Sequence, residues 1–213
     1  MENTNKIEII GDIVNGPVLD HEIYGEKFYS LNVRTKRLSD VEDILPVLIS
    51  ERIININDLK ENTKIKIIGQ LRSYNRMNEN KVKLILNVFV KEIEIIEDEN
   101  VKDKNIIELN GFICKKPVYR NTLKGRQICD ILLAVNRNYK KSDYVPTICW
   151  GRNSNFAKNL DIGANISITG RLQSREYNKK ISEEVSETRI AYEVSISKLE
   201  VINTETENKT NEE

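Results

Sequence analysis

Hydrophobic and polar residues alternate along several short stretches of this chain, and some of these stretches contain an internal glycine, which suggests a bulge or a tight bend. Successive side chains of a β-strand point to opposite faces of a sheet, so this two-residue period predicts strands buried on one side. In the first half it predicts strands at residues 7–14, 28–35, 45–52, 65–73 and 82–96. In the second half it predicts strands at residues 107–114, 128–136, 144–152, 166–174 and 190–202.

The two halves are copies of one unit, because the sequence aligns with itself at a nearly constant offset. KIEIIGDIVNGPV from Lys6 aligns with IIELNGFICKKPV from Ile106, and KIKIIGQLRS (64–73) aligns with NISITGRLQS (165–174). Glycine and proline fix turns and bulges, so matches at these residues indicate a shared chain path. Such matches occur at Gly11/Gly111, Pro17/Pro117, Gly25/Gly125 and Pro46/Pro146.

A short mixed segment follows the third expected strand of each unit, NINDLKEN (55–62) and NSNFAKNLD (153–161). Each has room for a short helix, and Phe156 and Leu160 would share a helical face that closes one end of a barrel. Five strands, a helix after the third and glycine bends are typical of the OB fold, whereas an SH3-like barrel usually lacks the helix. The sequence therefore predicts an all-β protein with two tandem five-stranded OB-fold barrels.

Segments poor in apolar residues set the expected boundaries. EDENVKDKN (97–105) is strongly charged, and NTETENKTNEE (203–213) has nothing to bury. We expect an N-terminal OB-fold at 1–98, a linker at 99–104, a C-terminal OB-fold at 105–202 and a disordered polar tail at 203–213.

Charge is unevenly distributed, although the formal net charge of the 213 residues is zero. Residues 1–100 carry 14 Lys and Arg against 18 Asp and Glu, whereas residues 101–202 carry 18 against 11. A basic second unit beside an acidic first unit is what a polyanion binder with one working face would show.

Several classes of protein are disfavoured. No apolar run reaches the ~18 residues of a membrane helix, and the N-terminus does not resemble a signal peptide. Cys114, Cys129 and Cys149 form no CxxC pair and are expected to be reduced thiols of a cytoplasmic protein. The single histidine, His21, cannot build a multi-histidine metal site, and no catalytic or nucleotide-binding motif is present. We therefore expect no cofactor, no metal and no enzymatic activity.

The second unit resembles the bacterial single-stranded DNA-binding proteins from Asn105 to Ile202, most specifically through GRLQSREY (170–177). In that family, bases stack on aromatic residues of the second, third and fourth strands. The resemblance carries this role to Tyr139, Tyr144, Trp150 and Tyr177, three of which are tyrosine where the family often has Trp or Phe.

Strand geometry supports the same surface. Tyr144, Pro146, Ile148 and Trp150 share one face of the third strand, and Arg171, Gln173, Arg175 and Tyr177 share the face of the fourth strand opposite its core residues. Unpaired bases stack on aromatic rings, and cationic side chains bind phosphates. The expected phosphate contacts are Arg126, Arg137, Lys140, Lys141, Arg152, Arg171, Arg175, Lys179 and Lys180.

Each assignment has a structural alternative. Trp150 follows an apolar run and would also suit the core, while Tyr139 and Tyr144 would also suit a strand edge. The lysine pairs 140–141 and 179–180 would also suit solvated hairpin tips. The first unit departs from the pattern, with Ser39, Ile44, Ser50 and Arg76 at the four aromatic positions, so we interpret it as a degenerate copy.

The sequence thus predicts a protein that binds and protects single-stranded DNA in replication, recombination or repair. The alternatives are a primosome-type assembly module that binds a protein partner and an RNA-binding OB module. Family members commonly present four OB folds, so a homodimer of this two-barrel chain is expected. The acidic Pro-Phe tip that recruits partners in the family is missing, since the chain ends in TNEE.

Overall fold

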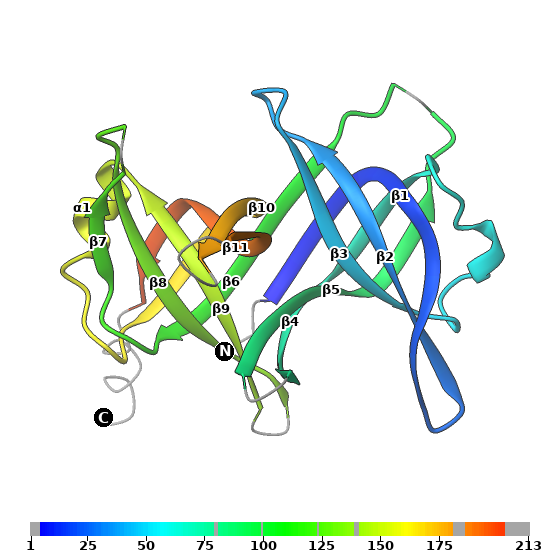
Figure 1. Cartoon of the computed structure of the whole chain (residues 1–213), viewed down its shortest axis with the longest axis horizontal. Coiled ribbons are helices and arrows are strands. Elements are labelled where there is room, and N and C mark those ends of the chain that lie inside the picture. Colours follow the sequence, from blue (N-terminus) through cyan, green and yellow to red (C-terminus); the bar gives the residue numbers. More distant parts are fainter. Residues whose placement is uncertain are drawn as a thin grey trace, which may run out of the picture.

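The structure is a computed structural model that describes residues 5–78, 81–98, 100–122, 124–138, 141–180 and 186–202. Its strands form two barrels that lie side by side (Figure 1). The strands of the first half are β1 (Asn5–Ile23), β2 (Glu26–Lys36), β3 (Glu42–Ser50), β4 (Lys64–Asn78) and β5 (Lys81–Ile95). Those of the second half are β6 (Lys104–Ile113), β7 (Val118–Asn121), β8 (Gln127–Asn136), β9 (Ser142–Trp150), β10 (Asn165–Lys180) and β11 (Ser186–Val201).

The two barrels have the same strand order. The first runs β2-β3-β5-β4-β1 and closes through the pairing of β1 with β2. In the second, β8, β9, β11, β10 and β6 take the corresponding places, and β6 pairs with β8. The third and fifth strands are parallel in both, as β3 with β5 and β9 with β11. The predicted pair of five-stranded OB-type barrels is confirmed.

The barrels differ in two details that the repeat did not predict. In the first, β1 continues through Gly16 and Pro17, with register shifts against β2. In the second, the chain leaves β6 at Ile113 and resumes as the short strand β7, which pairs with β8. The segment after the third strand is helix α1 (Arg152–Ala157) in the second barrel but only the 3-10 turn η1 (Ile56–Asp58) in the first.

The prediction that Phe156 packs inward is wrong, because its side chain is half exposed. Ser154 and Ala157 are the buried residues of α1, and Ala157 belongs to the core. Leu160, just after α1, packs partly buried against the core as predicted, and Leu59, just after η1, is buried in the first barrel. The inward face of α1 is therefore marked by Ser154 and Ala157, three residues apart, and Phe156 lies outside it.

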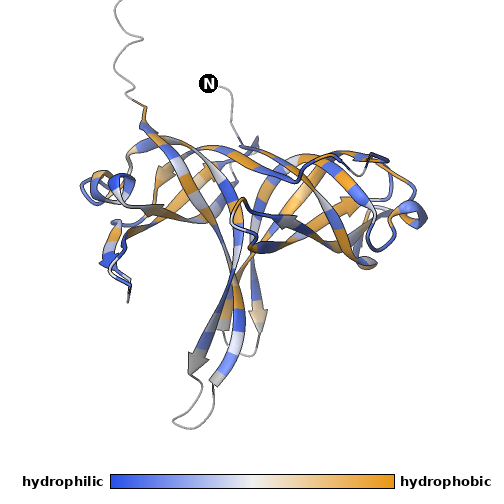
Figure 2. Ribbon diagram, turned by 90° about the horizontal axis from the view of Figure 1, so that it is seen from above, coloured by the Kyte–Doolittle hydropathy of each residue, from blue (hydrophilic) through white to orange (hydrophobic). Residues whose placement is uncertain are grey.

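Alternation between buried and exposed positions produces the core. Along β8, for example, Ile131, Leu133 and Val135 are buried, and the residues between them are partly exposed. Alternate positions of β1, β3 and β6 behave alike, whereas three successive residues of β9, Thr147 to Cys149, are buried. Isoleucine, leucine and valine make up most of both cores, and the second core also contains Cys129, Cys149 and Ala157. Figure 2 shows the hydrophobic stretches along the strands of both barrels, and two long hairpins that project from between them.

The barrels join through one continuous ladder, in which β1 pairs antiparallel with β6 from Asn5/Leu109 to Ile10/Lys104. Ile7 lies opposite its own repeat equivalent, Ile107. The two copies are therefore related by a pseudo-two-fold axis at this point. We call residues 5–10 and 104–109, with the loops that flank them, the barrel seam.

The predicted linker corresponds in part to the segment between Ile95 and Lys104, which contains no strand in its described residues. Glu99 and the predicted tail 203–213 lie outside the described residues. In the part of the chain that the structure describes, no helix has the length and hydropathy needed to span a membrane.

Candidate nucleic-acid interface

The outer face of β9 carries the aromatic residues that the pattern placed together. Tyr144 is 46% exposed and Trp150 is 37% exposed, with Pro146 half-buried between them. Ile148 is buried, so the face is interrupted there. The indole N–H of Trp150 donates to Ser195 Oγ at 3.2 Å, which fixes the ring while leaving part of it accessible. Trp150 is thus not a core residue.

The outer face of β10 is less uniform than predicted. Tyr177 is partly exposed, and the Arg175 guanidinium lies 5.9 Å from the centre of its ring. Gln173 is buried and donates to Glu193 Oε1 at 2.8 Å, so it is not part of the surface. Arg171 is half-buried near the barrel seam, where burial and the charge of Arg37 lower the pKa of its guanidinium.

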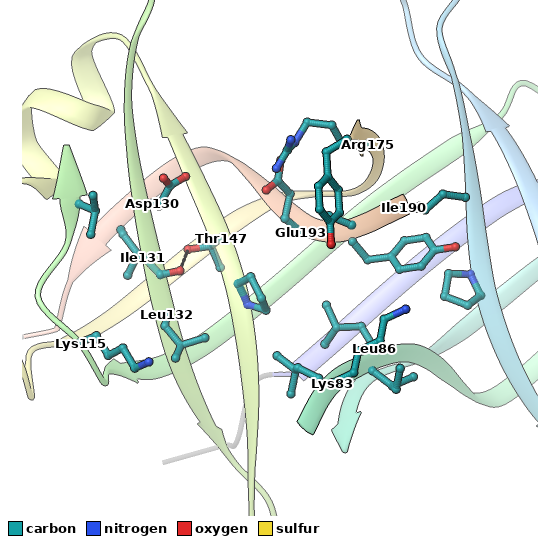
Figure 3. Close-up of a pocket in the computed structure, with 18 of the residues that line it drawn as sticks. Lys83, Leu86, Lys115, Asp130, Ile131, Leu132, Thr147, Arg175, Ile190 and Glu193 are labelled. Atoms are coloured by element: carbon teal, nitrogen blue, oxygen red, sulfur yellow. Dashed lines mark hydrogen bonds and ion pairs between the residues drawn. The ribbon is translucent and has the colours of Figure 1, made fainter. Parts of the chain in front are cut away.

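A groove between the two barrels brings these strands together (Figure 3). Arg175 and Tyr177 line one side from β10, and Pro146 and Thr147 line another from β9. The first barrel also contributes, through its third strand and the hairpin end of β5. We call this the central groove, and its lining from the first barrel is Pro46, Lys83, Leu84, Ile85 and Leu86.

Cations surround an apolar floor in the central groove. Two of them face carboxylates, since Arg120 Nε lies 2.8 Å from Asp130 and Arg175 Nε lies 3.5 Å from Glu193. Lys83, Lys115 and Lys116 are exposed at its rim. The sequence prediction missed these three lysines. The adjacent pair Lys115–Lys116 was a visible signal, but only the tertiary structure brings Lys83 from the first barrel to the same groove.

Trp150 lies in a second, smaller hollow with Gly125, Arg126 and Gln127. Arg126 is exposed there, and Arg152 is exposed at the start of α1, just after Trp150. The loop before β8 and the end of β9 thus place two predicted phosphate contacts close to one predicted stacking residue.

Arg137 has a different environment from the one predicted. Its guanidinium forms a two-point ion pair with the fully buried Asp143 and donates to the carbonyl of Ser73 at 3.1 Å. Asp143 also accepts from the backbone N–H of Ser73. Arg137 therefore joins the second barrel to β4 of the first.

The remaining predicted residues differ in how far the structure describes them. Lys141 is exposed at the start of β9, whereas Tyr139 and Lys140 lie outside the described residues. Lys179 and Lys180 occupy the last positions of β10, opposite Glu187 and Ser186 of β11.

The first barrel presents different chemistry at the equivalent positions. Ser50 is buried and donates to Glu26, while Ile44 is partly exposed beside β10. Tyr74 is 43% exposed on β4. Among the described residues, no group of three or more His, Cys, Asp or Glu is placed to hold a metal ion, and His21 instead contacts Asp20 and stacks on Phe28.

Comparison with known proteins assigns the second half of the chain to a family. The profile of the single-strand binding protein family matches residues 104–201. Single-stranded DNA-binding protein B of Bacillus subtilis is 31% identical over 83 residues, which cover 36% of this chain and 74% of that protein. The chain belongs to the single-strand binding protein family.

Other relatives are covered less completely. Single-stranded DNA-binding protein 1 of Lactococcus lactis is 31% identical over 40% of this chain, and the match spans 62% of its length. For single-stranded DNA-binding protein A of Bacillus subtilis the match spans 56% of its length. The matched part of the chain thus corresponds to a little over half of these two family members.

The fold of the whole chain, both barrels included, matches a solved structure. The single-stranded DNA binding protein from Thermus aquaticus superposes with a TM-score of 0.74 over 93% of each chain, at 20% sequence identity. A deletion mutant of the same protein gives a TM-score of 0.72 over 96% of this chain. The tandem arrangement of barrels is therefore shared with a family member of low sequence identity.

Proposed function

We propose that the protein binds single-stranded DNA and protects it during replication, recombination or repair, without catalysing a reaction on it. The observation that carries the proposal is the exposure of aromatic residues on β9, a strand that also lines the cation-rimmed central groove. Tyr144 and Trp150 are exposed on this strand, and Pro146 of the same strand lines the groove beside Tyr177. Family membership of the second half supports the same role.

The chemistry of this surface suits an unpaired strand. Each base stacked on an aromatic ring adds ~1–3 kcal/mol without sequence preference. Lysines at the groove rim would neutralise phosphates and release counterions. The stacking residues in this proposal are Tyr139, Tyr144, Trp150 and Tyr177, and the phosphate contacts are Lys83, Lys115, Lys116, Arg126, Lys140, Lys141, Arg152, Arg175, Lys179 and Lys180.

The two barrels have unequal roles in this proposal. The C-terminal barrel, 105–202, supplies the aromatic residues, while the N-terminal barrel, 1–98, supports it and lines one side of the groove. Arg137 and Arg171 are assigned to the barrel seam, since both guanidinium groups are partly buried there. We place the protein in the cytoplasm, in keeping with three cysteines that remain free thiols.

Titration with oligo-dT at two salt concentrations tests the proposal. We expect Trp150 fluorescence to be quenched and the affinity to fall with salt, because phosphate binding releases counterions. Absence of both a gel shift and quenching with a long oligo-dT at low salt would contradict it. A gel shift without quenching would remove only Trp150 from the stacking set, and competition by oligo-U would measure any preference for RNA.

We further propose that two chains associate to present four barrels. The pseudo-two-fold pair inside one chain already has the arrangement of a symmetric dimer of single barrels, so a second chain would complete a four-barrel assembly. Light scattering at micromolar concentration should give twice the chain mass of 24.7 kDa. A monomer under these conditions would refute this proposal without affecting DNA binding.

A further inference from the structure

A second basic site lies at the barrel seam, away from the residues that line the central groove. Arg72 of β4 and Lys91 of β5 approach it from the first barrel, and Arg137 and Lys141 approach it from the loop between β8 and β9. Gln70, Asn136 and Asn138 add neutral amide groups, and no carboxylate of the described residues lines it. We call it the seam cleft.

The charges in the seam cleft are only partly compensated. Arg137 is paired with Asp143, which is fully buried behind it. Arg72 lies over the Phe89 ring at 5.2 Å, and its Nη2 donates to Gln70 Oε1 at 2.7 Å. Its Nε is buried and has no hydrogen-bond partner among the described residues.

Burial and the nearby charge of Arg137 lower the pKa of the Arg72 guanidinium. A buried cationic donor without a partner is costly, and an anion in the cleft would offset that cost. Phosphate is the anion that an arginine, lysines and amide donors together recognise best.

The pseudo-two-fold axis supplies an internal comparison. The equivalent cleft on the other side of the barrel seam also contains cations, but two carboxylates line it with them. Its charged lining is Lys36, Arg37, Lys102, Lys104 and Arg171 with Asp43 and Asp103, and Ser197 lies among them. Ser197 takes the place of Lys91, since each is the extra residue at the bulge opposite the fourth-strand glycine. A cleft at the barrel seam can therefore form with carboxylates in its lining. The absence of carboxylates from the lining of the seam cleft is not a requirement of the fold.

We propose that the seam cleft binds backbone phosphates of the single strand, so that the first barrel is part of the nucleic-acid path. This inference rests on the proposed function. It adds Arg72 and Lys91 of the first barrel to a site that also contains Lys141 of the second.

A charge-matched pair of double variants tests the proposal. Lys91→Gln/Lys141→Gln removes two exposed cations from the seam cleft, and the control Lys36→Gln/Lys102→Gln removes two exposed cations from the equivalent cleft. Each double variant lowers the net charge of the protein by two. The long-range electrostatic attraction of DNA therefore changes by the same amount in both. The probe is an oligo-dT of about 30 nucleotides, long enough for two OB folds at ~4–16 nucleotides each.

For the seam-cleft variant we expect the Kd to rise about five- to ten-fold at low salt. We also expect the slope of log K against log salt to shrink by about 1.4, at ~0.7 per lost phosphate contact. The control should change both quantities by less than half as much. Equal effects in the two variants would overturn the seam cleft while leaving DNA binding intact, whereas a wild-type protein that does not bind oligo-dT would overturn the proposed function itself.

Arg72→Gln provides an independent readout at the buried donor. We introduce it into the seam-cleft double variant and expect oligo-dT binding to weaken further. The thermal unfolding midpoint of this triple variant should stay within a few degrees of the midpoint of the double variant. Unchanged binding with an unchanged midpoint would remove Arg72 from the site.

Discussion

Tyr177 differs from the other aromatic residues of the second barrel in its surroundings. It lines the central groove and lies beside the Arg175 guanidinium, which in turn faces Glu193 at 3.5 Å. Trp150, by contrast, is held by a hydrogen bond to Ser195. A ring that is accessible and adjacent to a cation is well placed to stack on a base whose phosphate meets that cation.

Tyr177→Ala should therefore weaken oligo-dT binding by ~1–3 kcal/mol, the value of one stacked base. The fold should persist, because the side chain is not part of the buried core. Tyr24→Ala is the control, since Tyr24 is fully exposed at the far hairpin tip of the first barrel. Fluorescence titration of both variants gives the comparison, and equal affinities would remove Tyr177 from the interface.

The cysteines allow a prediction about pH. Burial raises the pKa of Cys149 from 9.0 to about 12, and Cys129 opposite it is also fully buried. Both stay protonated in the folded protein at pH 8, so a thiol reagent should label only the partly exposed Cys114. Labelling of three thiols is expected after unfolding. The stabilisation from keeping Cys149 neutral should be complete below pH 9 and be lost as the pH rises toward about 12.

At the scale of the elements, the bulges opposite β4 and β10 shape both barrels. The ladder between β10 and β11 shifts register between Thr169 and Gly170, and that between β4 and β5 shifts between Ile68 and Gly69. At each glycine the neighbouring strand comes so close that a side chain has no room. A Cβ at Gly170 would lie 2.3 Å from the carbonyl oxygen of Ser195, and one at Gly69 would lie 2.4 Å from that of Phe89.

Gly170→Ala should therefore destabilise the protein by at least ~1–3 kcal/mol, the usual cost of overpacking, because backbone must move to admit the methyl group. Gly16→Ala is the matched control, since a Cβ there meets nothing within 4 Å. Urea unfolding of the two variants measures the difference. A Gly170→Ala variant as stable as Gly16→Ala would show that the bulge can relax without cost.

At the scale of the whole molecule, reciprocal contacts hold the barrels together. Asp143 of the second barrel accepts from the Ser73 N–H of the first, and Asp43 of the first accepts from the Ser174 N–H of the second at 2.8 Å. Each aspartate is fully buried and pairs with the arginine six residues before it, Arg137 or Arg37. Two equivalent Arg–Asp ion pairs, one in each barrel, therefore support the contacts between the barrels.

Asp143→Asn should destabilise the chain by ~3–5 kcal/mol, because the variant leaves the Arg137 charge partly buried without its partner. Asp43→Asn should cost a similar amount by the pseudo-two-fold relation. Asp161→Asn, at an exposed loop position, is the control and should stay within about 0.5 kcal/mol of wild type. Urea unfolding measures all three, and a loss at Asp143 no larger than at Asp161 would contradict a structural role for the seam ion pair.

The strand content, the repeat and the exposed aromatic residues of β9 follow from the order of residues along the chain. These features are local, because a two-residue period fixes which side chains share a face and glycine fixes where a strand can bend. Tyr144 and Trp150 are exposed as this period predicted, although Ile148 between them is buried. The helix after the third strand was predicted for both units but reduces to a 3-10 turn in the first.

Only the packing of the two barrels shows which cations face a possible ligand and which ones hold the barrels together. Arg137 and Lys141 lie four residues apart in the sequence. Arg137 forms an ion pair with Asp143 and donates a hydrogen bond to the Ser73 carbonyl, whereas Lys141 is exposed. Strand period also could not show that Gln173 is buried against Glu193, or that Lys83 and Arg72 of the first barrel border sites of the second. Such contacts depend on how two distant segments pack, and a pattern along one strand carries no information about the neighbouring barrel.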